Sequence, residues 1–69
     1  MKRSISISGH MTSIFLEDAF WQSLSDIAKE QNCSRSALIR KIDKEREAGE
    51  KLSSRLRIFV LAHYRDRVL

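Results

Sequence analysis

The sequence predicts a mainly α-helical domain with a short N-terminal β-strand or hairpin, and it predicts that two copies of the chain fold together. Three observations lead to this class. The chain has 69 residues, so a monomer buries a smaller fraction of its surface than a larger domain does. One segment alternates apolar and polar residues as a strand does. Three later segments repeat apolar residues at helical spacing.

The second copy of the chain is expected because other sources of stability are excluded. Small domains usually gain stability from disulfides, a bound metal or a second subunit. Cys33 is the only cysteine, and neither His10 nor His63 has further ligands at a zinc-site spacing. We therefore expect no metal, no cofactor and a single domain over residues 1–69 that forms a homodimer.

The strand candidate covers residues 3–16, RSISISGHMTSIFL, with Gly9-His10 in its middle. In one arrangement Gly9-His10 is a two-residue hairpin turn. The cross-strand pairs would then be Ile7 with Thr12, Ile5 with Ile14, and Ser6 with Ser13. In the other arrangement only residues 11–16 form a strand, and residues 1–9 are an arm that orders against a partner. The sequence is compatible with both.

A first helix is predicted over residues 17–31. Glu17 and Asp18 place carboxylates in its first turn, where they complement the helix dipole. Apolar residues then follow at three- and four-residue spacing: Phe20, Trp21, Leu24, Ile27 and Ala28. Asn32 tolerates the left-handed backbone that ends many helices.

A second helix is predicted over residues 34–48, with Ser34 as its N-cap and Gly49 as its stop. Its apolar stripe is narrow and consists of Leu38, Ile39 and Ile42. A third helix is predicted over residues 53–67, capped by Ser53 or Ser54. Its apolar residues extend around more of the circumference than one small monomer can bury: Leu56, Ile58, Phe59, Val60, Leu61 and Tyr64.

The charge distribution is compatible with a polyanionic partner. The 13 Lys and Arg and 9 Asp and Glu give a net charge of +4. Residues 1–33 carry a net −1 and residues 34–69 a net +5. The lone cysteine, the lack of an apolar signal segment and the lack of a membrane-length apolar run predict a cytoplasmic protein. No Gly-rich phosphate loop or nucleophile motif is present, so we do not expect an enzyme.

The order of these features resembles a known family. One alternating strand, a helix that opens on Glu17-Asp18, a tight turn around Asn32-Cys33-Ser34 and a helix that begins SRSALIR resemble the ribbon-helix-helix superfamily of the Arc and methionine repressor type. The segment LSSRLRIFVLAHYR is similar to the third helix of short bacterial members. The resemblance covers residues 3–67 and implies an intertwined homodimer whose strands at residues 11–16 pair into an intermolecular antiparallel ribbon. It further implies a small sequence-specific DNA-binding transcriptional regulator.

The resemblance also implies which residues contact DNA and which form the dimer core. The ribbon of this family lies in the major groove. Outward residues Met11, Ser13 and Phe15 would meet base edges, and Thr12, Ile14 and Leu16 would face inward. Phosphate contacts would come from Lys2, Arg3, Ser34, Arg35 and Ser36. The expected dimer core is Ile14, Leu16, Phe20, Trp21, Leu24, Ile27, Leu38, Ile39 and Ile42.

Two further observations bear on function. Arg35 stands at the positive end of a helix dipole, which is unfavourable for a purely structural arginine and favours a binding role. Met11 and Phe15 are apolar, so they either contact thymine methyl groups or pack against the N-terminal arm. The second case, together with the apolar third helix, favours an alternative function: an antitoxin-like or other protein-interaction module that binds a protein partner through the third helix.

Overall fold

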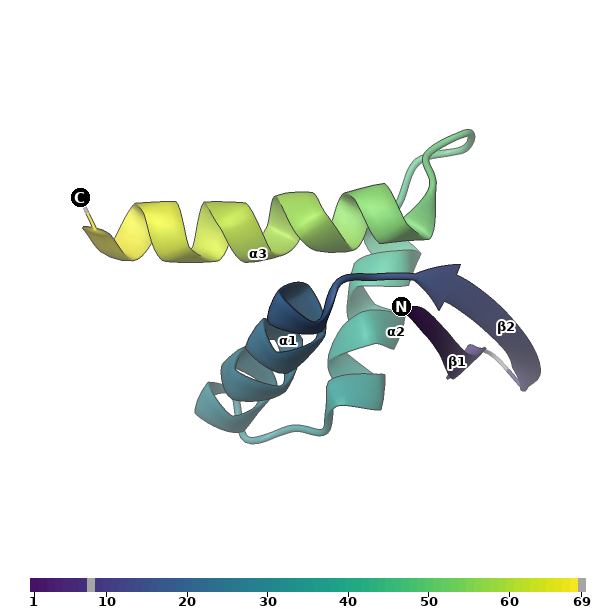
Figure 1. Ribbon diagram of the computed structural model, residues 1–69, viewed down its shortest axis with the longest axis horizontal. Helices are drawn as coiled ribbons and strands as arrows, with labels where there is room; N and C mark the ends of the chain where they lie inside the picture. The colour runs from purple at the N-terminus through teal and green to yellow at the C-terminus, as the bar shows by residue number, and fades with distance from the viewer. Residues whose placement is uncertain (8, 69) are drawn as a thin grey trace.

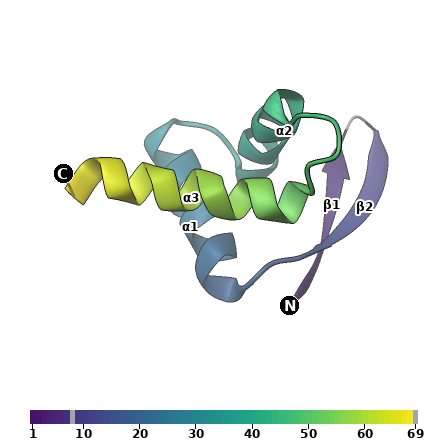
Figure 2. The ribbon, with the colours of Figure 1, turned by 90° about the horizontal axis from the view of Figure 1, so that it is seen from above.

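The computed structural model describes residues 1–7 and 9–68. A two-stranded antiparallel hairpin precedes three helices, which confirms the predicted class (Figure 1). The elements are β1 (Lys2–Ile7), β2 (His10–Phe15), α1 (Asp18–Glu30), α2 (Arg35–Glu45) and α3 (Leu52–Val68). In Figure 1, α2 lies between α1 and the hairpin, and α3 runs across the top of both helices. The view from above shows the same arrangement, with the hairpin at one end of the molecule (Figure 2).

The hairpin exists, but its predicted turn is wrong. Ile7 pairs with His10, so His10 is a strand residue and only residues 8 and 9 separate the strands. Gly9 has a φ of +82°, the left-handed conformation that tight hairpin connections require. Because residues 8 and 9 separate the strands, instead of residues 9 and 10, the register shifts by two residues. The observed pairs include Ile5 with Thr12 and Ser4 with Ser13. The alternative of an unpaired arm over residues 1–9 is also wrong.

A shift of two residues leaves the faces of the strands unchanged, because side chains alternate with a period of two. Ile5 is buried, and Ile7 and Ile14 pack against the core as partly buried residues. Thr12 lies opposite Ile5 on the inner face but is exposed in the single chain, so its inward role in a dimer stays a prediction.

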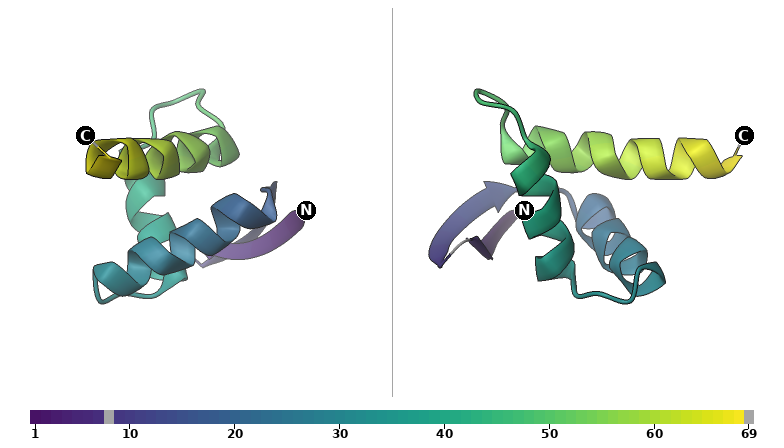
Figure 3. Two further views of the ribbon diagram at one scale, coloured as in Figure 1. Left: turned by 60° about the vertical axis from the view of Figure 1, so that its left-hand side comes forward. Right: turned by 180° about the vertical axis from the view of Figure 1, so that it is seen from behind.

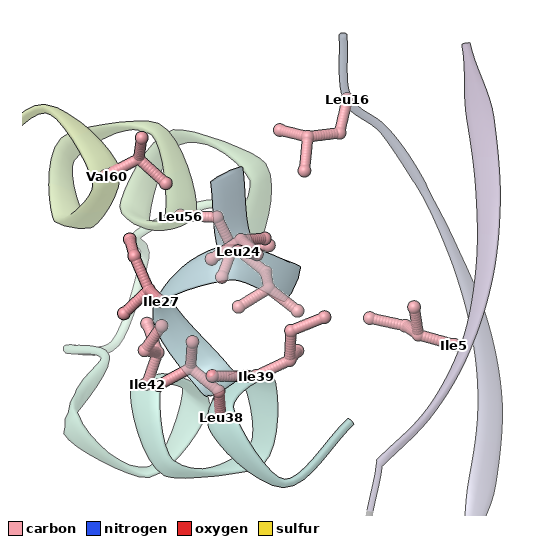
Figure 4. Close-up of a cluster of buried hydrophobic side chains, with 11 residues drawn as sticks. Ile5, Leu16, Leu24, Ile27, Leu38, Ile39, Ile42, Leu56 and Val60 are labelled. Carbon is pink, nitrogen blue, oxygen red and sulfur yellow. The ribbon is translucent and has the colours of Figure 1, made fainter. Parts of the chain in front are cut away.

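The core of the chain lies where the three helices and the hairpin meet. Figure 4 shows Ile5 from β1 and Leu16 from the β2–α1 junction approaching side chains of all three helices. The largest fully buried side chains are Leu16, Leu24, Ile27, Leu38, Ile39 and Leu56. Ile42 is also buried, and Ile14, Phe20 and Trp21 pack against the cluster as partly buried residues. All the residues expected in the dimer core therefore belong to the core of one chain, and their contribution to a dimer stays a prediction.

The turn between α1 and α2 has the chemistry that the sequence predicted. Asn32 has a φ of 57°, in the left-handed region. The Ser34 hydroxyl accepts a hydrogen bond from the backbone N–H of Ala37 at 3.0 Å, which caps α2. These two residues bring the chain back beside α1 within a few positions, as both views of Figure 3 show.

The boundaries around the α2–α3 loop differ from those predicted. α2 ends at Glu45 rather than near Gly49, and α3 begins at Leu52, so neither Ser53 nor Ser54 is its N-cap. The loop has its own hydrogen bonds, which compete with helix continuation. Arg46 donates to the Asp43 carboxylate at 3.0 Å and to the carbonyl of Glu50 at 2.7 Å. Burial of Leu52 in the core fixes where α3 begins.

Candidate nucleic-acid interface

The outer face of the hairpin is its solvent-exposed face, which carries Lys2, Ser4 and Ser6 from β1 and Met11, Ser13 and Phe15 from β2. All six residues are exposed, and Met11 and Phe15 are 73% and 68% exposed. The predicted base-contacting residues therefore lie together on one accessible surface. The hairpin therefore leaves both apolar side chains mostly exposed.

Ser4 and Ser6 are outer-face residues that the sequence prediction of DNA contacts omitted. The register places Ser4 opposite Ser13 and Ser6 opposite Met11. Serine hydroxyls both donate and accept hydrogen bonds. Ser4 and Ser6 therefore add two such groups to the one that Ser13 supplies from β2. The signal was present in the SISI alternation of residues 4–7, which places Ser4 and Ser6 on the strand face opposite to Ile5 and Ile7.

The start of α2 is the second part of the candidate interface. The first backbone N–H groups of a helix have no partner within the helix, and the Ser34 hydroxyl satisfies one of them. Ser36 is exposed in the first turn, and α2 has no acidic residue there. This end of α2 therefore keeps its positive character, which favours contact with an anion.

Trp21 of α1 is the centre of a cluster of cations beside that helix start. The guanidinium carbon of Arg35 lies 4.2 Å from the centre of the Trp21 ring, and that of Arg3 lies 5.0 Å from it. Both distances are within the range of cation–π attraction. Arg3 also forms an ion pair with Asp18. Among the described residues, no carboxylate lies within ion-pair distance of Arg35, and its buried Nε has no hydrogen-bond partner.

A surface hollow of about 430 Å³ joins the outer face to the start of α2. It brings together one predicted base-contacting residue, Met11, and three predicted phosphate-contacting residues. Its lining consists of Ser4, Ile5, Ser6, Met11, Trp21, Ser34, Arg35 and Ser36. Arg3 does not line the hollow, but its guanidinium contacts the ring of Trp21, which does. Lys2, Ser13 and Phe15 share the outer face but do not line the hollow.

Two arginines of the second half are used within the fold instead. Arg46 forms an ion pair with Asp43 at 3.0 Å. Arg57 of α3 bonds the Glu17 carboxylate at 2.8 Å and the carbonyl of Phe15 at 3.1 Å. The hydrogen bond from Arg57 lowers the pKa of Glu17 below its usual value, with a smaller contribution from the backbone N–H of Glu17. This pair connects α3 to the junction between β2 and α1.

A second groove, of about 650 Å³, runs along the other edge of the hairpin. β2 forms one wall, and the end of α2 and the start of α3 form the other, with Asp43, Arg46 and Leu52 among its residues. β1 pairs with only one edge of β2, so the backbone groups of the β2 edge at this groove have no strand partner in the described chain. The outer edge of β1 also lacks a strand partner among the described residues, and the β2 edge is the one that faces this groove.

The remaining candidates for chemistry have structural contacts. His63 is partly buried, lies 3.4 Å from the Glu30 carboxylate and packs against Phe59 and Tyr64. Within residues 1–7 and 9–68, no group of His, Cys, Asp and Glu is arranged to hold a metal ion. None of the described helices has the length and apolar character needed to cross a membrane.

The comparison with known families accounts for this combination of hairpin, helix start and third helix. The sequence model of the ribbon-helix-helix domain matches residues 1–64, which include the hairpin, α1, α2 and most of α3. No curated protein and no solved structure matches the chain. This fold is one of DNA-binding regulators, and its domains are typically dimeric and not enzymes. The chain, as its sequence resemblance predicted, belongs to the ribbon-helix-helix domain family.

Proposed function

We propose that the chain is a sequence-specific DNA-binding protein that acts as a homodimeric transcriptional regulator. The outer face of the hairpin enters the major groove, where Ser4, Ser6 and Ser13 bond base edges and Met11 and Phe15 contact thymine methyl groups. The start of α2 contacts the phosphate backbone beside that groove through Ser34, Arg35 and Ser36. Lys2 and Arg3 at the beginning of β1 add cationic contacts.

One observation carries this proposal above the others: Arg35 lies at the positive end of α2 next to the outer face. The described chain gives it an aromatic neighbour but no carboxylate. A guanidinium in that position has a strong remaining capacity for hydrogen bonds to a phosphate. The hollow between Arg35 and the outer face is continuous, so one DNA duplex can contact both surfaces.

The proposed dimer forms through the unpaired edge of β2. Antiparallel pairing of two β2 strands satisfies the backbone groups along that edge and gives the twofold symmetry expected of a homodimer. Sedimentation equilibrium should therefore give twice the chain mass of 8.0 kDa. A folded monomer at high concentration would contradict the dimer while leaving the single-chain fold intact.

The direct test is fluorescence anisotropy of labelled random duplex DNA titrated with protein over a series of salt concentrations. We expect binding that weakens steeply with salt, because phosphate contacts release counterions. Arg35→Ala should weaken binding at low salt by about tenfold or more, since hydrogen bonds to charged groups contribute roughly 1.5–3 kcal/mol. It should also reduce the salt slope by about one for each arginine lost.

Arg40→Ala is the matched control, because Arg40 is an exposed arginine on the same helix and lines neither groove. This variant removes the same charge and should change the slope far less than Arg35→Ala. Absence of binding at low salt for a folded dimer would contradict DNA binding. Equal effects of the two variants would contradict a specific role for Arg35 and leave only general charge attraction.

A second function is favoured by exposed apolar residues in two places. Ile58 and Leu61 of α3 are 52% and 57% exposed, and Met11 and Phe15 remain exposed on the hairpin. We propose as the alternative an antitoxin-like module that binds a protein partner through α3 on the same dimeric fold. Ile58→Ser with Leu61→Ser should then abolish the interaction with a purified partner and leave DNA binding unchanged. If the double variant instead dissociates the dimer, α3 is an interface between copies of this chain.

A further inference from the structure

We infer that Trp21 is a positioning residue for DNA binding, which holds the guanidinium group of Arg35 in the orientation that meets a phosphate. This inference rests on the proposed function. It assigns to Trp21 a role separate from its packing against the core, and it makes α1 part of the interface through one side chain.

The geometry separates Trp21 from the ordinary core residues. Leu24 and Ile27, the next apolar residues on α1, have no exposed surface. Trp21 is only partly buried and lines the hollow beside Ser34 and Arg35. One part of its ring therefore packs against the core, while another part is available to the two arginines.

An arginine side chain has several rotatable bonds, and ordering it on binding costs conformational entropy. Stacking at 4.2 Å on Trp21 restricts the guanidinium of Arg35 before DNA arrives. An aromatic ring orders the group without neutralising it, because the ring carries no net charge. A carboxylate in the same place would order the side chain but would compete with phosphate. Trp21 therefore lowers the ordering cost and keeps the full charge of Arg35 for the ligand.

Arg3 connects this arrangement to β1. Its guanidinium lies 5.0 Å from the Trp21 ring and is paired with Asp18, at the first residue of α1. This pair makes Arg3 a tie between the hairpin and α1, with less capacity for phosphate than Arg35. The cluster thus fixes the outer face of the hairpin relative to the start of α2, so that base contacts and phosphate contacts have a set spacing.

The test compares Trp21→Phe with Trp21→Leu in the anisotropy assay. Both substitutions shrink the side chain and keep it apolar, but only phenylalanine retains a ring face for a guanidinium. Trp21→Leu should weaken DNA binding roughly two- to fivefold per site relative to Trp21→Phe, the range that corresponds to one exposed cation–π contact. The salt slope should stay unchanged, since no charge is removed.

A double-mutant cycle distinguishes positioning from a general effect on the fold. If Trp21 acts through Arg35, Trp21→Leu should cause little further loss of affinity in the Arg35→Ala background. Circular dichroism melts show whether each variant is folded at the assay temperature. Trp21 is also the only tryptophan, so its emission in the wild type should change when DNA binds, and should change less in Arg35→Ala than in Arg40→Ala.

The outcomes separate this inference from the proposed function. Loss of binding in the wild type itself overturns both. Normal wild-type binding with equal affinities for the Phe and Leu variants, or with additive effects in the cycle, overturns the positioning role alone. Should Trp21→Leu fail to fold, the emission comparison between Arg35→Ala and Arg40→Ala still decides, because equal DNA-induced changes in those variants overturn the role.

Discussion

Arg35 and Arg46 stand at opposite ends of α2 and have opposite surroundings. Arg35 lies at the start of the helix, 4.2 Å from the centre of the Trp21 ring, without a carboxylate partner among the described residues. Arg46 lies just past the end of the helix and donates to the Asp43 carboxylate and the Glu50 carbonyl. An aromatic partner leaves the charge of an arginine available for a ligand, whereas a carboxylate and a carbonyl use its donors within the fold.

The same contrast runs through the whole chain and explains why net charge alone predicts little. Arg57 bonds Glu17 at the junction between β2 and α1, and Arg67 forms an ion pair with Glu30 of α1, so both connect α3 to other parts of the fold. These arginines count toward the net charge of +4 but belong to structural pairs. Net charge therefore does not identify a DNA-binding surface, and Arg35 is proposed for that role because it lies beside Trp21 at the start of α2 without a carboxylate partner among the described residues.

The largest effect is expected when a buried side chain that packs α2 into the core is truncated. Leu38 is 1% exposed and lies one turn from Arg35. Leu38→Ala should lower the free energy of unfolding by about 2–5 kcal/mol, because it removes buried methyl groups and leaves a cavity. Urea denaturation followed by circular dichroism measures this loss. Arg40→Ala on the exposed side of α2 should cause a much smaller change, and equal losses would show that α2 is not anchored by its apolar stripe.

An effect of about 1 kcal/mol is expected at the start of α2 when its cap is removed. The Ser34 hydroxyl accepts the Ala37 N–H, so Ser34→Ala should reduce stability by that amount and should also weaken DNA binding. Ser36 is exposed in the same turn and accepts no such capping bond. Ser36→Ala should therefore weaken DNA binding with little change in stability. Equal stability losses in the two variants would contradict the assignment of Ser34 as the cap.

A smaller effect is expected at the other end of the helix. Arg46→Gln should cost about 0.2–1 kcal/mol, the usual range for an ion pair at the protein surface, because both side chains are partly exposed. It should leave the salt slope of DNA binding unchanged, because Arg46 lies at the groove of the β2 edge, at the end of α2 opposite Arg35, and is already paired with Asp43. Lys44→Gln removes the same charge from an exposed residue and should affect neither property. If the salt slope of DNA binding fell in Arg46→Gln but not in Lys44→Gln, the phosphate contacts would lie at the end of α2, which would contradict the proposal that they lie at its start.

The sequence predicted some of these features correctly and others wrongly, for physical reasons. Helical periodicity located the apolar stripes, and the preferences of Asn32 and Ser34 located the turn before α2, because both signals depend on residues close in the chain. The register of the hairpin was wrong by two residues. Alternating serine and isoleucine give the same faces for any shift of two, so only the conformation of Gly9 decides between registers.

Contacts between distant residues lay beyond the sequence patterns. Trp21, which was expected in the dimer core, packs against the core of one chain, but its stacking with Arg35 depends on how α1 and α2 approach each other. The loop that follows Glu45 is held in part by the hydrogen bond from Arg46 to the carbonyl of Glu50, and helical periodicity does not predict this bond. The predicted phosphate-contacting residues Ser34, Arg35 and Ser36 do line one hollow, and their contact with DNA stays a prediction.

The smallest effect is expected for Arg57, and it should depend on pH. The bond from Arg57 lowers the pKa of Glu17 below its usual value of 4.5. A carboxylate with a lowered pKa in the folded state contributes stability above the unfolded pKa and loses it as pH falls through the folded pKa. Arg57→Gln should therefore slightly lower the Tm at pH 7, and its difference from the wild type should shrink as the pH falls below about 4.5.

Arg65→Gln is the control for this last measurement, because Arg65 is exposed on the same helix and forms no ion pair with the described residues. It removes the same charge, so it reports the general effect of net charge on the Tm at each pH. A difference between the two variants that persists unchanged at pH 3 would show that Arg57 stabilises the chain through the Phe15 carbonyl instead of Glu17, since protonation does not affect that bond. In that case Arg57 would anchor the end of β2 directly, and the outer face of the hairpin would depend on α3 for its position.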